Sequence, residues 1–257
     1  MGRKPVFTVV ILISLLVIGC SGGGSIPEES IENRQDVGSN SSNEELSVSE
    51  FRQKAIQTIK TITSIRYTNV SETTGDQSTP SYQEEVEYAE PGQYRSKIQL
   101  ADGTKGEAIY MDSRYCSRKI GAENWYCTEG YVISDSKKDT WIDIINGKTI
   151  GQNSVSSNRT ELTEINGKPC RLFTVTELYE DKEDSQEDNW EYSLCIDTTT
   201  FLPISQLTTF VHRIEGVVQQ RIEARETYRD FNESITIDFP ANNLVWGEPW
   251  NAPPWNN

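Results

Sequence analysis

Residues 190–211, WEYSLCIDTTTFLPISQLTTFV, contain two strand-like runs separated by a short turn. In the first run, polar or small residues separate four large apolar ones, Trp190, Tyr192, Leu194 and Ile196. Asp197, Thr200 and Pro203 follow this run, and residues of these types favour a turn. A period of two is typical of a strand that buries one face. The stretch therefore predicts an antiparallel hairpin with one face against a core.

Runs with the same period recur along most of the chain. They predict further strands over residues 65–73, 82–89, 93–100, 107–111, 125–128, 171–178, 217–228 and 235–239. Short loops join successive runs, and short connections favour strands that pair with their neighbours in sequence. We therefore expect an antiparallel meander in which most strands bury one face.

Two segments have helical spacing instead. Residues 47–62 open with the capping box Ser47-Val48-Ser49-Glu50, and their apolar residues then recur every three or four positions. Residues 137–147 place Trp141 on one helical face with two isoleucines, and Gly147 is suited to end that helix. The order of helix, strands, helix and strands predicts one α+β domain over residues 45–240.

The first residues of the chain have the features of an export signal. Arg3 and Lys4 precede an apolar run over residues 6–18, which is short for a membrane-spanning helix, and Gly19-Cys20 follows directly. This ending resembles a bacterial lipobox, which implies cleavage after residue 19 and lipid attachment to the Cys20 sulfur. The alternative is an uncleaved anchor with an incidental cysteine.

The lipobox implies a protein anchored by lipid to the cell membrane, on its extracytoplasmic face. Residues 1–19 are then the signal peptide, and residues 20–44 carry the lipidated cysteine and a Gly/Ser/Asn-rich flexible tether. The Trp/Pro-rich tail over residues 241–257 is predicted to be extended and folded back on the domain, with partner binding as the alternative.

Four cysteines remain besides Cys20, an even number that favours disulfides in an exported protein. Four cysteines allow three pairings, and the strand pattern favours Cys116 with Cys127 and Cys170 with Cys195. A zinc site is the rival interpretation, but no C-x₂₋₄-C spacing is present. The acidic run between Cys170 and Cys195, residues 181–189, is predicted to be a solvated hairpin loop.

The composition and the missing motifs argue against several classes of function. With 24 Lys+Arg against 39 Asp+Glu, the net charge of −15 disfavours nucleic-acid binding. The single histidine, His212, is not accompanied by a nucleophile-elbow, phosphate-loop or EF-hand motif. We therefore predict a non-catalytic protein without metal or cofactor. A hydrolase of envelope polymers is the weaker alternative.

Several short motifs resemble the LolA-like superfamily of exported lipoproteins, in particular the branch of LppX- and LprG-type lipid carriers. The resembling stretches are GQYRSKIQL (residues 92–100), EAIYMDSRYCSRKIGAENWYC (107–127), INGKPCRLFTVTE (165–177) and ETYRDFNESITIDFP (226–240), together with the hairpin at residues 190–206. They carry the family's turn and strand positions at Asn166, Gly167, Trp190, Asp197, Thr200, Pro203, Tyr228, Asp230, Phe231, Asn232, Ile235, Ile237 and Pro240. The two cysteine pairs depart from the family's usual pattern.

The resemblance implies a strongly curved antiparallel sheet, an incomplete barrel closed by helices around an apolar cavity. Such a protein binds or carries a lipid or another amphiphile by burying its acyl chains. The residues expected to line the cavity are Phe51, Ile59, Tyr94, Ile98, Tyr110, Trp141, Trp190 and Tyr192. The alternative is a non-catalytic sensor or interaction module of the cell envelope, which would use the same fold to bind an envelope protein.

Overall fold

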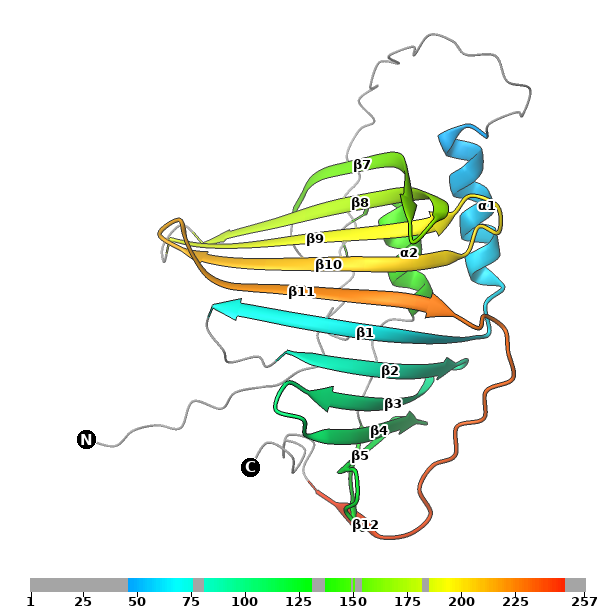
Figure 1. Cartoon of the computed structure of the whole chain (residues 1–257), viewed down its shortest axis with the longest axis vertical. Coiled ribbons are helices and arrows are strands. Elements are labelled where there is room, and N and C mark those ends of the chain that lie inside the picture. The colour runs from blue at the N-terminus through cyan, green and yellow to red at the C-terminus, as the bar shows by residue number, and fades with distance from the viewer. Residues whose placement is uncertain are drawn as a thin grey trace.

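The computed structural model describes residues 46–75, 81–130, 137–148, 150, 154–181 and 185–247 (Figure 1). The signal peptide, Cys20, the tether and residues 248–257 of the tail lie outside these residues. The helices are α1 (Val48–Lys60) and α2 (Lys137–Asn146). The strands are β1 (Ser64–Gly75), β2 (Tyr82–Ala89), β3 (Gln93–Leu100), β4 (Lys105–Met111), β5 (Arg114–Lys119), β6 (Trp125–Glu129), β7 (Ser154–Ile165), β8 (Lys168–Asp181), β9 (Gln186–Asp197), β10 (Pro203–Ile214), β11 (Val217–Arg229) and β12 (Leu244–Trp246).

In the described part of the chain, all twelve strands form one sheet in the order β12-β6-β5-β4-β3-β2-β1-β11-β10-β9-β8-β7. Two meanders, β1–β6 and β7–β11, are joined by antiparallel pairing of β1 with β11. Every pairing is antiparallel except that of β12 with β6, which is parallel. The predicted α+β meander, interrupted by a helix, is confirmed.

Two predictions about the strands need correction, and one strand was not predicted. Residues 235–239 do not form a strand, because their backbone pairs with no neighbour there; Ile237 instead buries its side chain against β4–β6. The strand β7 was not predicted, since it is an edge strand whose described side chains are almost all exposed and show no apolar period. The acidic hairpin loop is shorter than predicted, because β9 already begins at Gln186.

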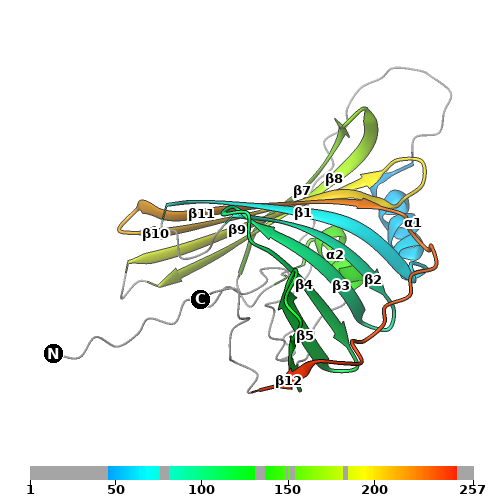
Figure 2. The ribbon, with the colours of Figure 1, turned by 60° about the horizontal axis from the view of Figure 1, so that its bottom comes forward.

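The sheet is strongly curved, and both helices lie on the inside of the curve (Figure 2). We call this face the inner face and the opposite one the outer face. The predicted capping box starts α1: Ser47 Oγ accepts a hydrogen bond from the Glu50 backbone N–H, and the Glu50 carboxylate accepts one from the Ser47 N–H at 3.1 Å. Helix α2 ends at Gly147, whose φ of 68° suits a residue without a Cβ.

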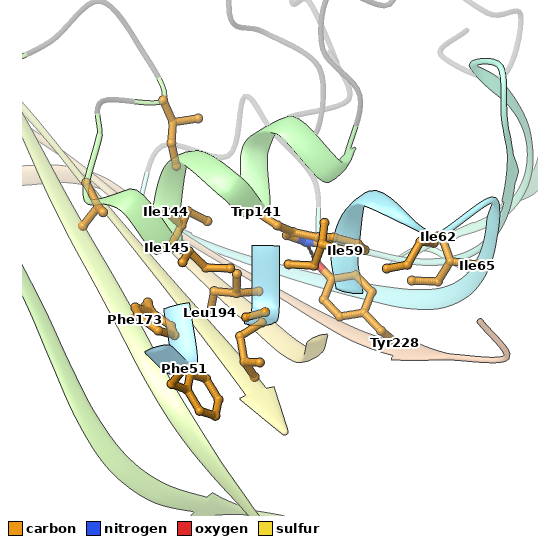
Figure 3. Packing of buried hydrophobic residues seen from close by; sticks show 14 residues of the cluster. Phe51, Ile59, Ile62, Ile65, Trp141, Ile144, Ile145, Phe173, Leu194 and Tyr228 are labelled. Atoms are coloured by element: carbon orange, nitrogen blue, oxygen red, sulfur yellow. Dashed lines mark hydrogen bonds between the residues drawn. The ribbon is translucent and has the colours of Figure 1, made fainter. Parts of the chain in front are cut away.

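The main core lies between the two helices and the inner face (Figure 3). Helix α1 buries Phe51, Ala55 and Ile59, and α2 buries Trp141 and two isoleucines. They pack against inward-facing residues from both meanders, namely Ile65, Phe173, Val175, Leu194, Ile196 and Tyr228. This core therefore ties the two halves of the sheet together.

The outer face carries both predicted cysteine pairs. Cys116 and Cys127 are direct cross-strand partners on β5 and β6 with an S–S distance of 2.00 Å. Cys170 and Cys195, on β8 and β9, have an S–S distance of 2.02 Å. The segment after β11 runs along the outside of β4–β6, where Ile237 and the first disulfide share a second core (Figure 1). Neither disulfide therefore lies on the inner face.

Candidate functional site

The inner face is the candidate site, and its first part is filled by the two helices. Three of the predicted cavity residues, Phe51, Ile59 and Trp141, are at most 2% exposed in the main core. The Phe51 ring lies 6.2 Å from that of Phe173. In Figure 3 these side chains point toward one another between α1, α2 and the sheet. Here they act as packing residues.

The second part lies on the first meander, over β2–β4. Tyr94 and Tyr110 are cross-strand partners whose rings stack with centroids 5.6 Å apart, and both are buried. Val86 completes this small cluster. Ile98, another predicted cavity residue, lies two positions from Ser96 on β3 and remains half-buried. The first meander thus contributes its own apolar lining, separate from the main core.

The third part is a strip of aromatic residues on β9 and β10, Trp190, Tyr192 and Phe210, which we call the aromatic strip. The Trp190 ring centroid lies 4.3 Å from that of Phe210 and 6.2 Å from that of Tyr192. Tyr192 packs against the main core, and all three side chains remain half-buried. Burial, with the nearby Glu177 charge, raises the pKa of Tyr192. The strip continues the apolar inner face beyond the core.

A row of polar side chains crosses the middle of the same face. Gln206, Glu226, Asn69 and Glu84 occupy successive register positions on β10, β11, β1 and β2, and we call them the polar row. They are 5%, 6%, 2% and 2% exposed, respectively. Burying a polar group costs free energy unless the group is paired, so the stability of this face depends on the partners of these four side chains.

Glu226 is well paired. Its carboxylate lies 2.6 Å from the Lys137 Nζ of α2 and accepts a hydrogen bond from the Tyr228 hydroxyl. Trp141 Nε1 in turn donates to the Tyr228 oxygen at 3.1 Å, drawn as a dashed line in Figure 3. This network fixes the N-terminal end of α2 over β11. Burial raises the pKa of the Tyr228 hydroxyl well above its usual value, and the Glu226 charge adds to the shift.

Glu84 is less well paired. Burial raises its pKa to about 7, and the neighbouring Ser96 hydroxyl opposes this shift. The negative charge of Glu226 also raises the pKa, while Lys137 lowers it. Among the residues that the structure describes, its Oε1 atom has no hydrogen-bond partner. The same holds for Asn69 Oδ1 and for the hydroxyl oxygen of Ser71, which flanks Glu84 on the inner face.

The remaining charged groups of interest pair with one another on the second meander. His212 Nδ1 lies 2.6 Å from Asp188 Oδ1, and Arg213 pairs with Glu187. Both carboxylates were predicted to lie in the acidic loop, but they are on β9. Within the described ranges, no group of three or more His, Cys, Asp or Glu side chains is arranged to hold a metal ion. No described helix is long and apolar enough to span a membrane.

The polar row was missed at the sequence level, although a signal for it exists. Glu84 falls between Tyr82 and Val86, at the phase of β2 that faces inward. Glu226 likewise precedes inward-facing Tyr228 by two positions. A charged residue at the apolar phase of a strand indicates either an edge or a buried polar site. The sequence alone does not bring the four strands into register.

The chain matches no protein-family model and no curated protein. Similar solved structures include Mycobacterium tuberculosis lipoprotein LppX, with a TM-score of 0.44 and 11% identity over 74% of this chain and 98% of that one. Mycobacterium bovis LprF has a TM-score of 0.44 and 12% identity over 76% and 97%. A LolA superfamily protein from Nitrosomonas europaea has a TM-score of 0.27 and 9% identity over 76% and 96%. LppX and the LolA superfamily are the groups that the sequence motifs resemble. At these values the likeness assigns no ligand and no residue role.

Proposed function

We propose that this chain is an exported lipoprotein, anchored to the membrane through Cys20, that binds or carries a lipid or another amphiphile on the inner face of its sheet. In this proposal residues 1–19 are the signal peptide, residues 20–44 the tether and residues 45–240 the binding domain. The helices close part of an incomplete barrel. The protein acts without catalysis and without a cofactor.

The observation that carries the proposal is the half-buried aromatic strip. Trp190 and Phe210 extend the apolar inner face past the region that the helices fill, with ring centroids 4.3 Å apart. Aromatic side chains that remain partly exposed beside a core retain apolar area that an acyl chain can bury, at about 25 cal/mol per Å². Ile98 offers a similar half-buried surface on the first meander.

Native mass spectrometry of residues 21–257 tests binding directly. We expect the protein, purified from an oxidising compartment, to carry a mass excess that organic extraction removes, or to bind added phospholipid. Trp190→Ala should weaken phospholipid binding about tenfold, since it removes part of the aromatic surface. Trp246→Ala is the matched control, because Trp246 is 46% exposed on the edge strand β12.

A measured mass equal to that of the polypeptide alone, together with no binding of added phospholipid, would reject the carrier function. An interaction module of the cell envelope would then be the better interpretation. The anchor has its own test, because Cys20→Ala should abolish incorporation of labelled palmitate into the exported full-length chain.

A further inference from the structure

The polar row crosses the middle of the inner face. A carrier of purely apolar ligands would need no polar atoms there. One half of the row is satisfied within the protein. Glu226 pairs with Lys137 and accepts from Tyr228, and Gln206 Nε2 donates to Thr208 Oγ1 at 3.2 Å. These interactions hold α2 against the sheet and account for the burial of both residues.

The other half is not satisfied. Glu84 and Asn69 are each 2% exposed, and both have a side-chain oxygen without a hydrogen-bond partner among the described residues. The Asn69 amide nitrogen is engaged, since it donates to the Tyr82 hydroxyl at 3.3 Å. The hydroxyl oxygen of Ser71, which lies diagonally opposite Glu84, is likewise without a partner in the described part of the chain. Three buried oxygens that can accept hydrogen bonds, those of Glu84, Asn69 and Ser71, therefore occupy directly opposite and diagonal positions on β1 and β2, and one of them belongs to a carboxylate.

The position of these oxygens relative to the aromatic strip suggests how a ligand would reach them. One register row runs from Tyr192 through Thr208 and Ala224 to Ser71. The two side chains between the ends of this row are small. An elongated ligand lying against Tyr192 would extend over them and bring its end to Ser71 and the adjacent Glu84.

We propose that the oxygens of Glu84, Asn69 and Ser71 bind the primary ammonium group of an amphiphile whose chain lies along the aromatic strip. An ammonium group supplies three donors and one positive charge, which matches a set of acceptors with one carboxylate. A carboxylate or phosphate at the same place would face the negative charges of Glu84 and Glu226. Lys137, which pairs with Glu226, offsets only one of these two charges. This inference rests on the proposed function.

Three probes with the same chain length separate the polar site from apolar binding. Isothermal titration of residues 21–257 with dodecylamine, dodecanol and dodecanoate, each below its micellar concentration at pH 8, measures the preference for the head group. We expect dodecylamine to bind at least about tenfold more tightly than dodecanol, because a charge-assisted hydrogen bond contributes that much. Dodecanoate should bind more weakly than dodecanol.

Glu84→Gln should remove the preference for the amine and leave dodecanol binding unchanged. The matched control is Glu85→Gln, which removes the same charge from an exposed residue on the outer face of the same strand. Circular dichroism checks that both variants fold.

Equal affinity of the wild-type protein for amine and alcohol would overturn the ammonium site, as would a preference that survives in Glu84→Gln. Either outcome leaves the proposed apolar binding intact. Failure of all three probes to bind would reject the proposed function together with the site.

Discussion

Glu84 is the residue whose protonation should be most visible in the stability of the protein. Burial raises its pKa from the usual 4.5 to about 7, so the folded protein binds a proton that the unfolded chain has already released. The favourable contribution of the neutral form is complete below about pH 4.5, and it is lost as the pH rises through about 7. The free energy of unfolding should therefore fall over this window, by roughly 3 kcal/mol for this group.

Urea denaturation at several pH values, compared between the wild type and Glu84→Gln, isolates this contribution. The variant should lack the loss of stability and should become the more stable of the two above pH 7. Glu85→Gln, which changes an exposed carboxylate, should follow the wild-type curve. Parallel curves for the wild type and Glu84→Gln from pH 4 to 8 would show that Glu84 titrates normally in the folded protein.

The start of α1 depends on a local arrangement that the sequence already contained. Ser47→Ala removes the acceptor of the Glu50 N–H and one half of the capping box, so it should lower the free energy of unfolding by about 1 kcal/mol. Ser49→Ala, an exposed change within the first turn of the same helix, is the control. Equal denaturation midpoints for the two variants would mean that the cap does not stabilise α1.

The segment after β11 shows why an alternating pattern can be misread. Ile237 is 5% exposed and packs near Cys116 and Cys127, so its period of two reflects packing of an extended chain and not pairing in a sheet. Ile237→Ala should cost about 2–4 kcal/mol of unfolding free energy. Ile120→Ala, at a site that is 50% exposed, should have almost no effect. Similar small losses in both variants would show that the segment does not pack as described.

Local signals made the helices and most strands predictable. The Ser47–Glu50 capping box and the face formed by Trp141 belong to single segments, and the alternation of large apolar residues in β9 lies within one run, so each pattern is complete within its own stretch. The edge strand β7 gives no such pattern. The pairings of β1 with β11 and of β12 with β6 join distant segments, and so does the polar row built on the first pairing. A candidate site assembled from four strands can therefore be recognised only after their register is known.

At the scale of the whole molecule, the two meanders should unfold as one unit although each has its own disulfide. The ladder between β1 and β11 runs from Arg66–Arg229 to Gly75–Gln220, and the main core joins Ile65 of the first meander to Phe173 of the second. Neither half can lose its strands without exposing the core of the other. A single unfolding transition follows from this arrangement.

Replacing either cysteine pair by alanine tests this coupling. The pairs enclose sequence separations of 11 and 25 residues, so the loss of either should cost about 3 kcal/mol, and the loss of both should cost about the sum, because the pairs lie in different meanders. In calorimetry each variant should still show one transition at a lower temperature. If one variant instead splits the transition and leaves the other half at its original temperature, the shared core does not couple the meanders, and a ligand bound across β1 and β11 would act on only one of them.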